Sequence, residues 1–380
     1  MKEILPIVIG AFFWAWMTEA STRGKYGIHR QSAANMIPFF MLVLTLALPA
    51  VLRKSFNDTG AYIRSFYLAK PLAALLQSGE LHILRNPLFR IYESLIHSYT
   101  SNESIFFLFP AFFVQYTNVR FIRRHSPSFL MGIGLYLFLG TYVFSLAAMK
   151  QTIAMAMLLY AVEALMERKT FRFYLLVFVA FLFHTYAIMF VVLPLFTVKP
   201  WSPRTFLILF GIVFVMTNFD TVLQRFIDIA NESGKNVSAD EIIGAAAINP
   251  IRVAVYAVPS LFALVFRRYI FVGKGDREHN ILVNMAFLTE AIMSIGLVNA
   301  AYMFARMGQY FEFGIICGLP WMLSKPFDKS SERLVYLIAI VCFAGFFCYA
   351  NLIQIVFDEQ FGRYTVMQFL ERIAQDMFFG

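Results

Sequence analysis

The sequence predicts an all-α integral membrane protein that crosses the bilayer many times. Of its 380 residues, 59% are hydrophobic and only 14% are charged, and the mean hydropathy is +0.66. Soluble domains carry about 25% charged residues, so this composition indicates a chain largely in contact with lipid. The net charge of +9 does not indicate nucleic-acid binding, because the basic residues cluster between apolar runs, where they set membrane orientation.

Apolar runs predict ten spans, besides a further run at residues 171–196. A spanning helix needs about 20 largely apolar residues. The predicted spans are 4–20, 36–52, 104–119, 128–148, 151–166, 205–219, 250–266, 281–301, 308–323 and 334–355. The first run lacks a convincing cleavage site, so we interpret it as a retained helix and not as a signal peptide.

Basic clusters orient these spans. They follow the spans that end near residues 20, 119, 166, 266 and 323, and the positive-inside rule places all five in the cytoplasm. The segment 53–103 and the acidic segment 219–249 are then external. Within residues 53–103, two stretches combine helical periodicity with mixed polarity, which is typical of helices lying at a membrane surface. The C-terminal tail, residues 357–380, has the same pattern.

The run at residues 171–196 contains His184 near its centre. Both flanks, Arg168 to Arg172 and Lys199 to Arg204, carry cations that should face the cytoplasm, and one crossing cannot satisfy both. This favours a re-entrant or thinly spanning hairpin that turns near His184. The alternative is one tilted helix with Lys199 and Arg204 outside. The sequence thus predicts a single membrane domain over residues 1–380 with about 11–12 transmembrane or re-entrant helices.

Several polar and charged residues map to the outer half of the membrane, where such groups are costly and usually functional. Arg306 is flanked closely by apolar runs, with Tyr310 one helical turn later and Glu312 nearby, and arginine binds phosphate groups in a bidentate manner. Lys150 and Gln151 open a helix, whose free N–H groups also favour anions. The other candidates at this level are Asp58, His184 and Arg252.

Structural explanations compete with functional ones for these residues. Asp58 lies where a helix N-cap is expected, and Lys150 or Arg306 could simply extend to the lipid headgroups. Arg90 and Glu93 are three residues apart on a predicted helix, so we expect a surface ion pair. Arg85 precedes Asn86-Pro87 in a predicted turn, where it could bind a lipid phosphate.

Cations that hold a charged group, together with a carboxylate and an imidazole that can move a proton, indicate an external group-transfer site. The external segments contain no DxD, HExxH, GxSxG or P-loop string, so a nucleotide-sugar or metallohydrolase mechanism has no support. The three cysteines lie in apolar runs without zinc-ligand spacing. We therefore expect no metal and no cofactor.

The order of these motifs resembles the EpsG-like family. The matching pairs are Asp58 with Tyr62, Lys150 with Gln151, His184 with Thr185, and Arg306 with Tyr310, between about residues 50 and 310. Members are multi-pass inner-membrane proteins of bacterial exopolysaccharide, capsule and O-antigen loci, regarded as Wzy-type polymerases with a GT-C-like architecture. Two departures are Lys150, where the family usually has Arg, and Asn86, where many members carry an acid.

The resemblance implies that a growing glycan moves from an undecaprenyl diphosphate carrier to a lipid-linked repeat unit at the external face. Donor, acceptor and membrane lipid are the implied partners, with room for a chain-length regulator. Arg306, Lys150 and Arg252 would hold the diphosphate, and His184, Asp58 or Glu93 would serve the acceptor hydroxyl. We expect further substrate contacts from Gln151, Tyr62, Tyr310, Arg85 and Glu93. Alternatives are a flippase or transporter of lipid-linked sugars, and a lipid-linked-sugar glycosyltransferase or ligase.

Overall fold

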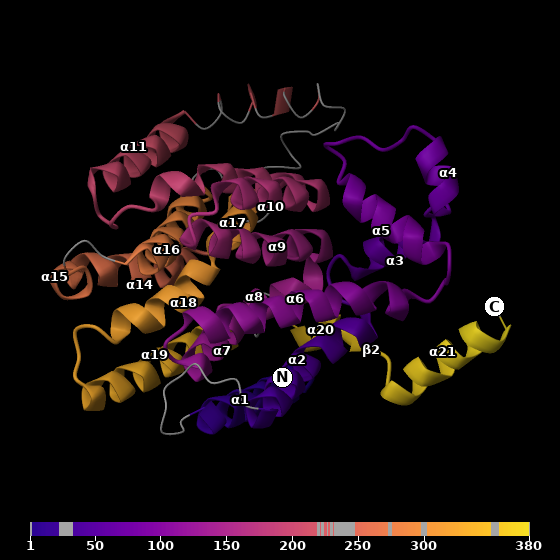
Figure 1. Ribbon diagram of the computed structural model, residues 1–380, viewed down its shortest axis with the longest axis horizontal. Coiled ribbons are helices and arrows are strands. Elements are labelled where there is room, and N and C mark those ends of the chain that lie inside the picture. Colours follow the sequence, from indigo (N-terminus) through magenta and orange to yellow (C-terminus); the bar gives the residue numbers. More distant parts are fainter. Residues whose placement is uncertain are drawn as a thin grey trace. The chain divides into compact units, whose positions relative to one another are not determined.

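The computed structural model describes residues 2–22, 33–218, 248–272, 276–297, 302–350 and 357–379, with a few further positions between 221 and 231. The chain divides into two compact units. The first comprises Met1–Ala161, Tyr174–Ala187 and Ala339–Gly380, and the second comprises Val162–Phe173 and Ile188–Ile338. Nearly all ordered elements are helices (Figure 1).

The predicted spans coincide with apolar helices. These are α1 (Ile4–Thr22), α2 (Ala33–Leu52), α6 (Glu103–His125), α7 (Phe129–Phe138), α8 (Thr141–Ala147), α9 (Met149–Met166), α11 (Pro203–Thr217), α14 (Pro250–Val265), α16 (Arg277–Ile295), α18 (Phe313–Leu323) and α19 (Lys329–Tyr349). Among the described residues, α1, α6, α9 and α19 are each long and apolar enough to cross a membrane.

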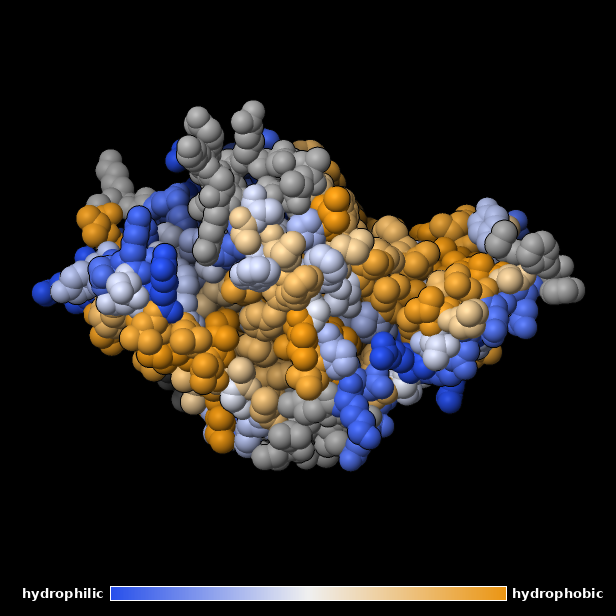
Figure 2. Space-filling model, turned by 90° about the horizontal axis from the view of Figure 1, so that it is seen from below, coloured by the Kyte–Doolittle hydropathy of each residue, from blue (hydrophilic) through white to orange (hydrophobic). Residues whose placement is uncertain are grey.

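Apolar side chains cover broad areas of the visible surface (Figure 2). The exposed large apolar residues of the chain include Trp16 on α1, Phe210 on α11 and Ile338 on α19, each at least half exposed. Large exposed apolar patches mark contact with membrane or partner, and here they lie on helices of spanning composition. The prediction of an all-α polytopic membrane protein is therefore confirmed. The number of crossings and the GT-C-like architecture stay predictions.

One predicted span is broken. Residues 128–148 form α7 and α8, which are bent by 52° at the break between them. Gly140 lies at this break with φ +86°, a left-handed conformation that glycine adopts without steric cost. The predicted span at residues 128–148 is therefore a bent pair of helices and not one continuous helix.

The helix type also changes at His184. The helix α10 (Thr170–Phe183) is followed by a 3-10 helix, η1 (Thr185–Phe196). The amide of His184 donates to the Ala180 carbonyl at 2.9 Å, and the amide of Ala187 donates to the His184 carbonyl at 2.9 Å. Runs of 3-10 helix beyond four residues are uncommon and often mark a hinge or strain. The hairpin at residues 171–196 stays a prediction, and the segment 219–249 lies largely outside the described residues.

The segment 53–103, which is predicted to be external, contains short helices. They are α3 (Thr59–Tyr67), α4 (Leu72–Gln77) and α5 (Pro87–His97). Phe66 and Phe89 from these helices pack with Phe106 of α6 and Ile153 of α9 in one buried aromatic cluster. This cluster fixes α3 and α5 against the ends of two membrane helices.

The C-terminal tail pairs with the same segment. The strand β1 (Arg53–Ser55) pairs antiparallel with β2 (Gly362–Arg363), which follows the short helix α20 (Phe357–Gln360). The last helix, α21 (Val366–Phe379), lies at the end of the chain (Figure 1). A Cβ at Gly362 would come within 2.7 Å of the Ser55 hydroxyl oxygen, so a side chain there would displace that hydroxyl.

A carboxylate at the start of α6 anchors α21. Arg372 donates to both oxygens of Glu103, at 2.7 and 2.6 Å. The hydroxyls of Tyr67 and Tyr364 donate to the same carboxylate at 2.7 and 2.9 Å. Glu103 is buried, so four donors compensate for removing its charge from water. The tail is thus held at the level where α6 begins.

In the second unit, α16 packs against α14, α18 and the short helix α17 (Tyr302–Gly308). The contact between α16 and α18 is close. A Cβ at Gly314 would lie 2.4 Å from the backbone nitrogen of Ala286, so only glycine allows this approach. The short 3-10 helix η2 (Gln309–Phe311) then links α17 to α18.

Candidate functional site

Lys150 lies at the start of α9, three residues after the end of α8. Its ammonium nitrogen is 4.7 Å from the ring centroid of Phe89 and 5.7 Å from that of Tyr62. Its backbone N–H donates to the Tyr62 hydroxyl at 3.4 Å. Cation–π contacts of this kind stabilise a partly desolvated ammonium. The cation is therefore held between α3 and α5. Gln151 beside it is buried.

Glu93 on α5 is buried, with a relative exposure of 5%. Within the described part of the chain, its Oε1 has no hydrogen-bond partner. Burial raises the pKa of this carboxyl above its ordinary value, although Lys150, Arg90 and His97 each interact favourably with its charge. The arrangement is a buried carboxylate with several cationic neighbours, which is typical of a group that binds or releases a proton.

The surface ion pair predicted between Arg90 and Glu93 is wrong. Arg90 instead pairs with Glu80, with 3.3 Å between guanidinium and carboxylate, and also donates to the Glu80 carbonyl at 2.9 Å. Spacing along a helix puts two side chains on one face, but tertiary packing decides whether that face is exposed. Here α5 turns Glu93 inward.

Asp58 occupies the N-cap position of α3, as its neighbours in the sequence predict, but its side chain makes no capping hydrogen bond. Its backbone carbonyl accepts the Tyr62 amide at 3.1 Å, and its carboxylate interacts favourably with Lys150. The carboxylate therefore lies within electrostatic reach of Lys150 and does not cap α3.

His184 and Thr185 are tied to the turn that begins α5. The Thr185 amide donates to Oδ1 of Asn86 at 3.2 Å. The Thr185 hydroxyl lies 3.1 Å from the same oxygen and 3.1 Å from the Leu84 carbonyl. Asn86 has φ +53°, a left-handed conformation that asparagine tolerates better than most residues. Two predicted motifs, almost a hundred residues apart, therefore meet directly.

The rest of this turn agrees with the prediction. Arg85 lies in the bend, is exposed, and donates its amide to the His82 carbonyl at 3.0 Å. The half-buried ring of His184 meets Tyr186 edge to face, with 5.2 Å between centroids.

The remaining predicted residues lie in the second unit. Arg306 is half-buried on α17, and Tyr310 is buried in η2. Glu312, which follows η2, is fully buried and accepts a short hydrogen bond from the Tyr256 hydroxyl. The Arg252 guanidinium lies over the Tyr256 ring, 5.7 Å from its centroid. Arg252 and Tyr256 are one helical turn apart on α14.

The predicted residues thus fall into two groups. The first unit brings together Asp58, Tyr62, Glu93, Lys150 and Gln151, with Arg85 and His184 at the turn leading into α5. The second unit contains Arg252, Arg306 and Tyr310. That both groups serve one external site stays a prediction.

Sequence reasoning missed three residues of these groups. Phe89 lies under the Lys150 ammonium, but an apolar residue in an amphipathic helix carries no distinguishing signal. Tyr256 could have been found from its spacing of four residues from Arg252. His97 could have been found in the same way from Glu93, and its buried Nδ1 has no hydrogen-bond partner among the described residues.

Fold and composition define the class as a multi-pass α-helical membrane protein. A partly buried cation at the start of one of its helices, Lys150 of α9, lies against the short helices α3 and α5. The chain belongs to the EpsG family, whose model matches residues 36–365. The predicted resemblance to this family is thereby confirmed. No curated protein and no solved structure matches the chain. Membership in this family indicates a role in polysaccharide biosynthesis of the polymerase type.

Proposed function

We propose that the protein is a polysaccharide polymerase that transfers a growing glycan from undecaprenyl diphosphate to a lipid-linked repeat unit at the external face of the membrane. Family membership supports the reaction class. The observation that carries the chemistry is the neighbourhood of Lys150, which pairs a cation held on aromatic rings with the buried carboxylate of Glu93.

The reaction needs a base and an anion-binding group. A sugar hydroxyl of the acceptor attacks the anomeric carbon of the donor glycan, and a new C–O bond forms. The bond between that carbon and the diphosphate oxygen breaks, so the polyprenyl diphosphate leaves with the electron pair. The hydroxyl proton passes to the base. Positive charge near the leaving oxygen stabilises the transition state.

Lys150 is suited to the leaving diphosphate, because the ring faces around it hold its ammonium in place before substrate binds. Glu93 is suited to the role of base. Burial raises the pKa of its carboxyl, so it accepts a proton more readily than an exposed glutamate does. The negative charge of its deprotonated form interacts favourably with Lys150, Arg90 and His97. His184 is the second candidate for the base. Asp58 is a candidate for orienting the acceptor.

In the second unit, we assign Arg306 and Arg252 to the diphosphate as well. Both are half-buried arginines, and the buried Tyr256–Glu312 pair lies below Arg252. A guanidinium can bind two phosphate oxygens at once, so these residues supply the bidentate contact that Lys150 cannot make. Protein cations alone can then supply the positive charge, and the proposal includes no metal.

The test uses purified protein in lipid discs with a synthetic undecaprenyl diphosphate repeat unit. A ladder of products with increasing length supports the polymerase. A single addition would instead indicate a transferase or ligase. The same protein is also reconstituted into sealed vesicles. Movement of the lipid-linked sugar across the vesicle bilayer without any new glycosidic bond would overturn the enzyme assignment in favour of a flippase. His184→Ala should stop chain growth without reducing the amount of membrane protein, whereas His82→Ala on the exposed bend is the matched control.

A further inference from the structure

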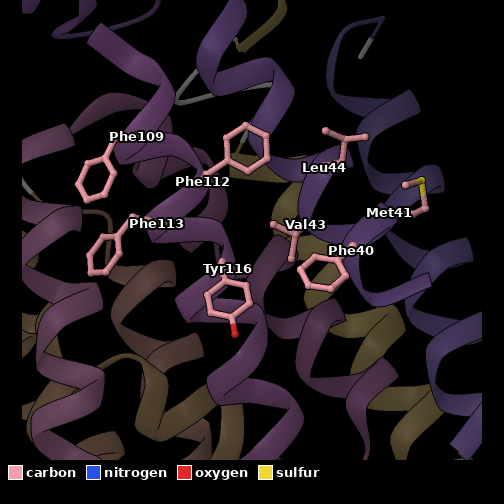
Figure 3. A pocket seen from close by; sticks show the side chains of 8 residues that line it. All are labelled: Phe40, Met41, Val43, Leu44, Phe109, Phe112, Phe113 and Tyr116. Atoms are coloured by element: carbon pink, nitrogen blue, oxygen red, sulfur yellow. The ribbon is translucent and has the colours of Figure 1, made fainter. Parts of the chain in front are cut away.

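An apolar groove runs between α2 and α6 in the first unit. Its volume is about 470 Å³, within the range of roughly 300–1,000 Å³ that small-molecule sites occupy. Figure 3 shows Phe109 and Phe113 on one side and Leu44 with Phe40 on the other. The only oxygen among the lining side chains is the hydroxyl of Tyr116. The groove therefore offers contact to hydrocarbon and almost no hydrogen bonding.

The groove is lined in part by α6, which is long and apolar enough to cross a membrane. Its residues on α6 extend from Phe109 to Tyr116, seven rises of about 1.5 Å, or roughly 10 Å along the helix. This is about a third of the hydrocarbon thickness of a bilayer. The groove begins six residues after Glu103, where α6 starts, so a chain lying in it would end roughly 9 Å below the start of that helix.

Contacting aromatic rings connect the groove to the Lys150 ammonium. Phe113 stacks on Phe109 at 5.7 Å between centroids, and Phe109 contacts Tyr92 of α5 at 5.9 Å. Tyr92 contacts Phe89 at 6.2 Å, and the ammonium of Lys150 lies 4.7 Å from the Phe89 centroid. An apolar groove and a cation, which suit the two ends of an anionic lipid, are thus joined within one compact unit.

We propose that this groove holds part of the isoprenoid chain of a polyprenyl diphosphate whose headgroup lies at Lys150. The assignment rests on the proposed function, because it requires a lipid diphosphate as substrate. The chain would enter from lipid tails that are as apolar as the groove, so its affinity comes from van der Waals packing against the aromatic lining and not from the hydrophobic effect. The ring contacts between the groove and Phe89 place the ammonium in the same unit as the groove. An ordinary phospholipid chain is the competing occupant.

The test maps the chain directly. The full-length protein, in discs of phosphatidylethanolamine and phosphatidylglycerol, is irradiated with undecaprenyl diphosphate that carries a diazirine on its isoprenoid chain. We expect labelled peptides at residues 40–44 and 109–116, and loss of this label with excess unlabelled undecaprenyl diphosphate but not with excess phosphatidylglycerol. Equal competition by both lipids, or no label at these positions, would overturn the assignment.

Two variants sharpen the result. Leu44→Trp fills the groove and should lower the competed label by about tenfold, since overpacking an occupied site is costly. Ile37→Trp, at a position on the same helix that is 66% exposed, should leave it unchanged. The mapping itself uses the unsubstituted protein and stands even if Leu44→Trp does not fold.

Chain growth is measured on the same preparation, which separates the two proposals. A product ladder without label in the groove would overturn the groove alone. Competed label without any ladder would support the lipid site and count against the polymerase.

Discussion

The amide of Thr185 donates a hydrogen bond of 3.2 Å to the side-chain oxygen of Asn86, across 99 residues of sequence. The bond joins the turn that starts α5 to the point where α10 gives way to a 3-10 helix. Because α5 also carries Glu93 and the ring of Phe89 under Lys150, the contact links the helix-type change at His184 to the groups proposed for catalysis.

Asn86→Ala should destabilise the protein by about 1–3 kcal/mol. The substitution removes the acceptor of the Thr185 amide, a hydrogen bond worth about 0.5–1.5 kcal/mol. It also places alanine in a left-handed conformation, which alanine tolerates less well than asparagine, at a further cost of about 1 kcal/mol. Asn86→Asp keeps an acceptor oxygen and should fold normally. Thermal unfolding in detergent measures both, and equal melting temperatures for Asn86→Ala and the unsubstituted protein would contradict the proposed link.

Chain growth should increase with pH above the ordinary glutamate pKa of about 4.3. Burial raises the pKa of Glu93, and a base must be deprotonated to act. Between the ordinary pKa and the raised pKa, Glu93 is protonated more often in the folded protein than in the unfolded chain. Its contribution to the free energy of unfolding therefore decreases as the pH increases through this range. The initial rate of chain growth as a function of pH is the measurement.

Glu93→Gln should remove this pH-dependent limb and lower the rate by about 10²–10⁴-fold. Glu80→Gln is the matched control, because Glu80 is a largely exposed partner of Lys70 and Arg90 outside the buried group. A Glu93→Gln variant with an unchanged pH profile would exclude Glu93 as the base and leave His184.

Lys150→Gln should reduce chain growth by about 10²–10³-fold, the loss expected when one group that stabilises a developing anion is removed. Lys150→Arg retains the positive charge and should retain activity. Tyr62→Phe keeps the ring near the ammonium and removes only the hydroxyl, so a small effect is expected. The measurement is the rate of chain growth with the synthetic repeat unit at saturating concentration. Equal rates for Lys150→Gln and the unsubstituted protein would exclude Lys150 as the group that stabilises the leaving diphosphate.

Arg306→Ala should abolish chain growth while the protein still accumulates in the membrane. Arg306→Lys retains charge but loses the bidentate geometry, so an intermediate rate is expected. Arg267→Ala, at the start of the short helix α15 (Arg267–Ile270) and exposed, serves as the control. Near-normal activity of Arg306→Ala would remove the main diphosphate assignment of the second unit.

Arg372→Ala should loosen the C-terminal helix. The substitution leaves the buried Glu103 without its bidentate partner. The free energy of unfolding should decrease by about 2–3 kcal/mol. This is less than the 3–5 kcal/mol typical of fully buried pairs, because Arg372 is 28% exposed. Arg363→Ala breaks an exposed pair with Glu3 and should cost at most about 1 kcal/mol. Protease cleavage between residues 365 and 379 reports the difference, and similar cleavage of both variants would contradict the anchor.

The positions of the membrane helices could be predicted because their apolar length is a property of each segment alone. The break at Gly140 could be suspected from its glycine, but φ +86° depends on how the flanking helices pack. For the site, motif order pointed to Lys150 and His184. The contact between Thr185 and Asn86 could not be predicted, because a single sequence does not show which residues far apart in the chain lie close together in the fold. The predicted ion pair between Arg90 and Glu93 was wrong for a related reason. Spacing shows which residues share a helix face, but it does not show whether that face is buried or exposed.

The pairing of β1 with β2 has a consequence for the order of folding. Ser55 and Gly362 are 307 residues apart, and the helices α3 to α20 lie between them in the sequence. This strand pair therefore cannot form until the intervening helices have been synthesised. Docking of the C-terminal tail beside the short helices that carry the proposed catalytic groups should accordingly be a late step of folding, after insertion of α19.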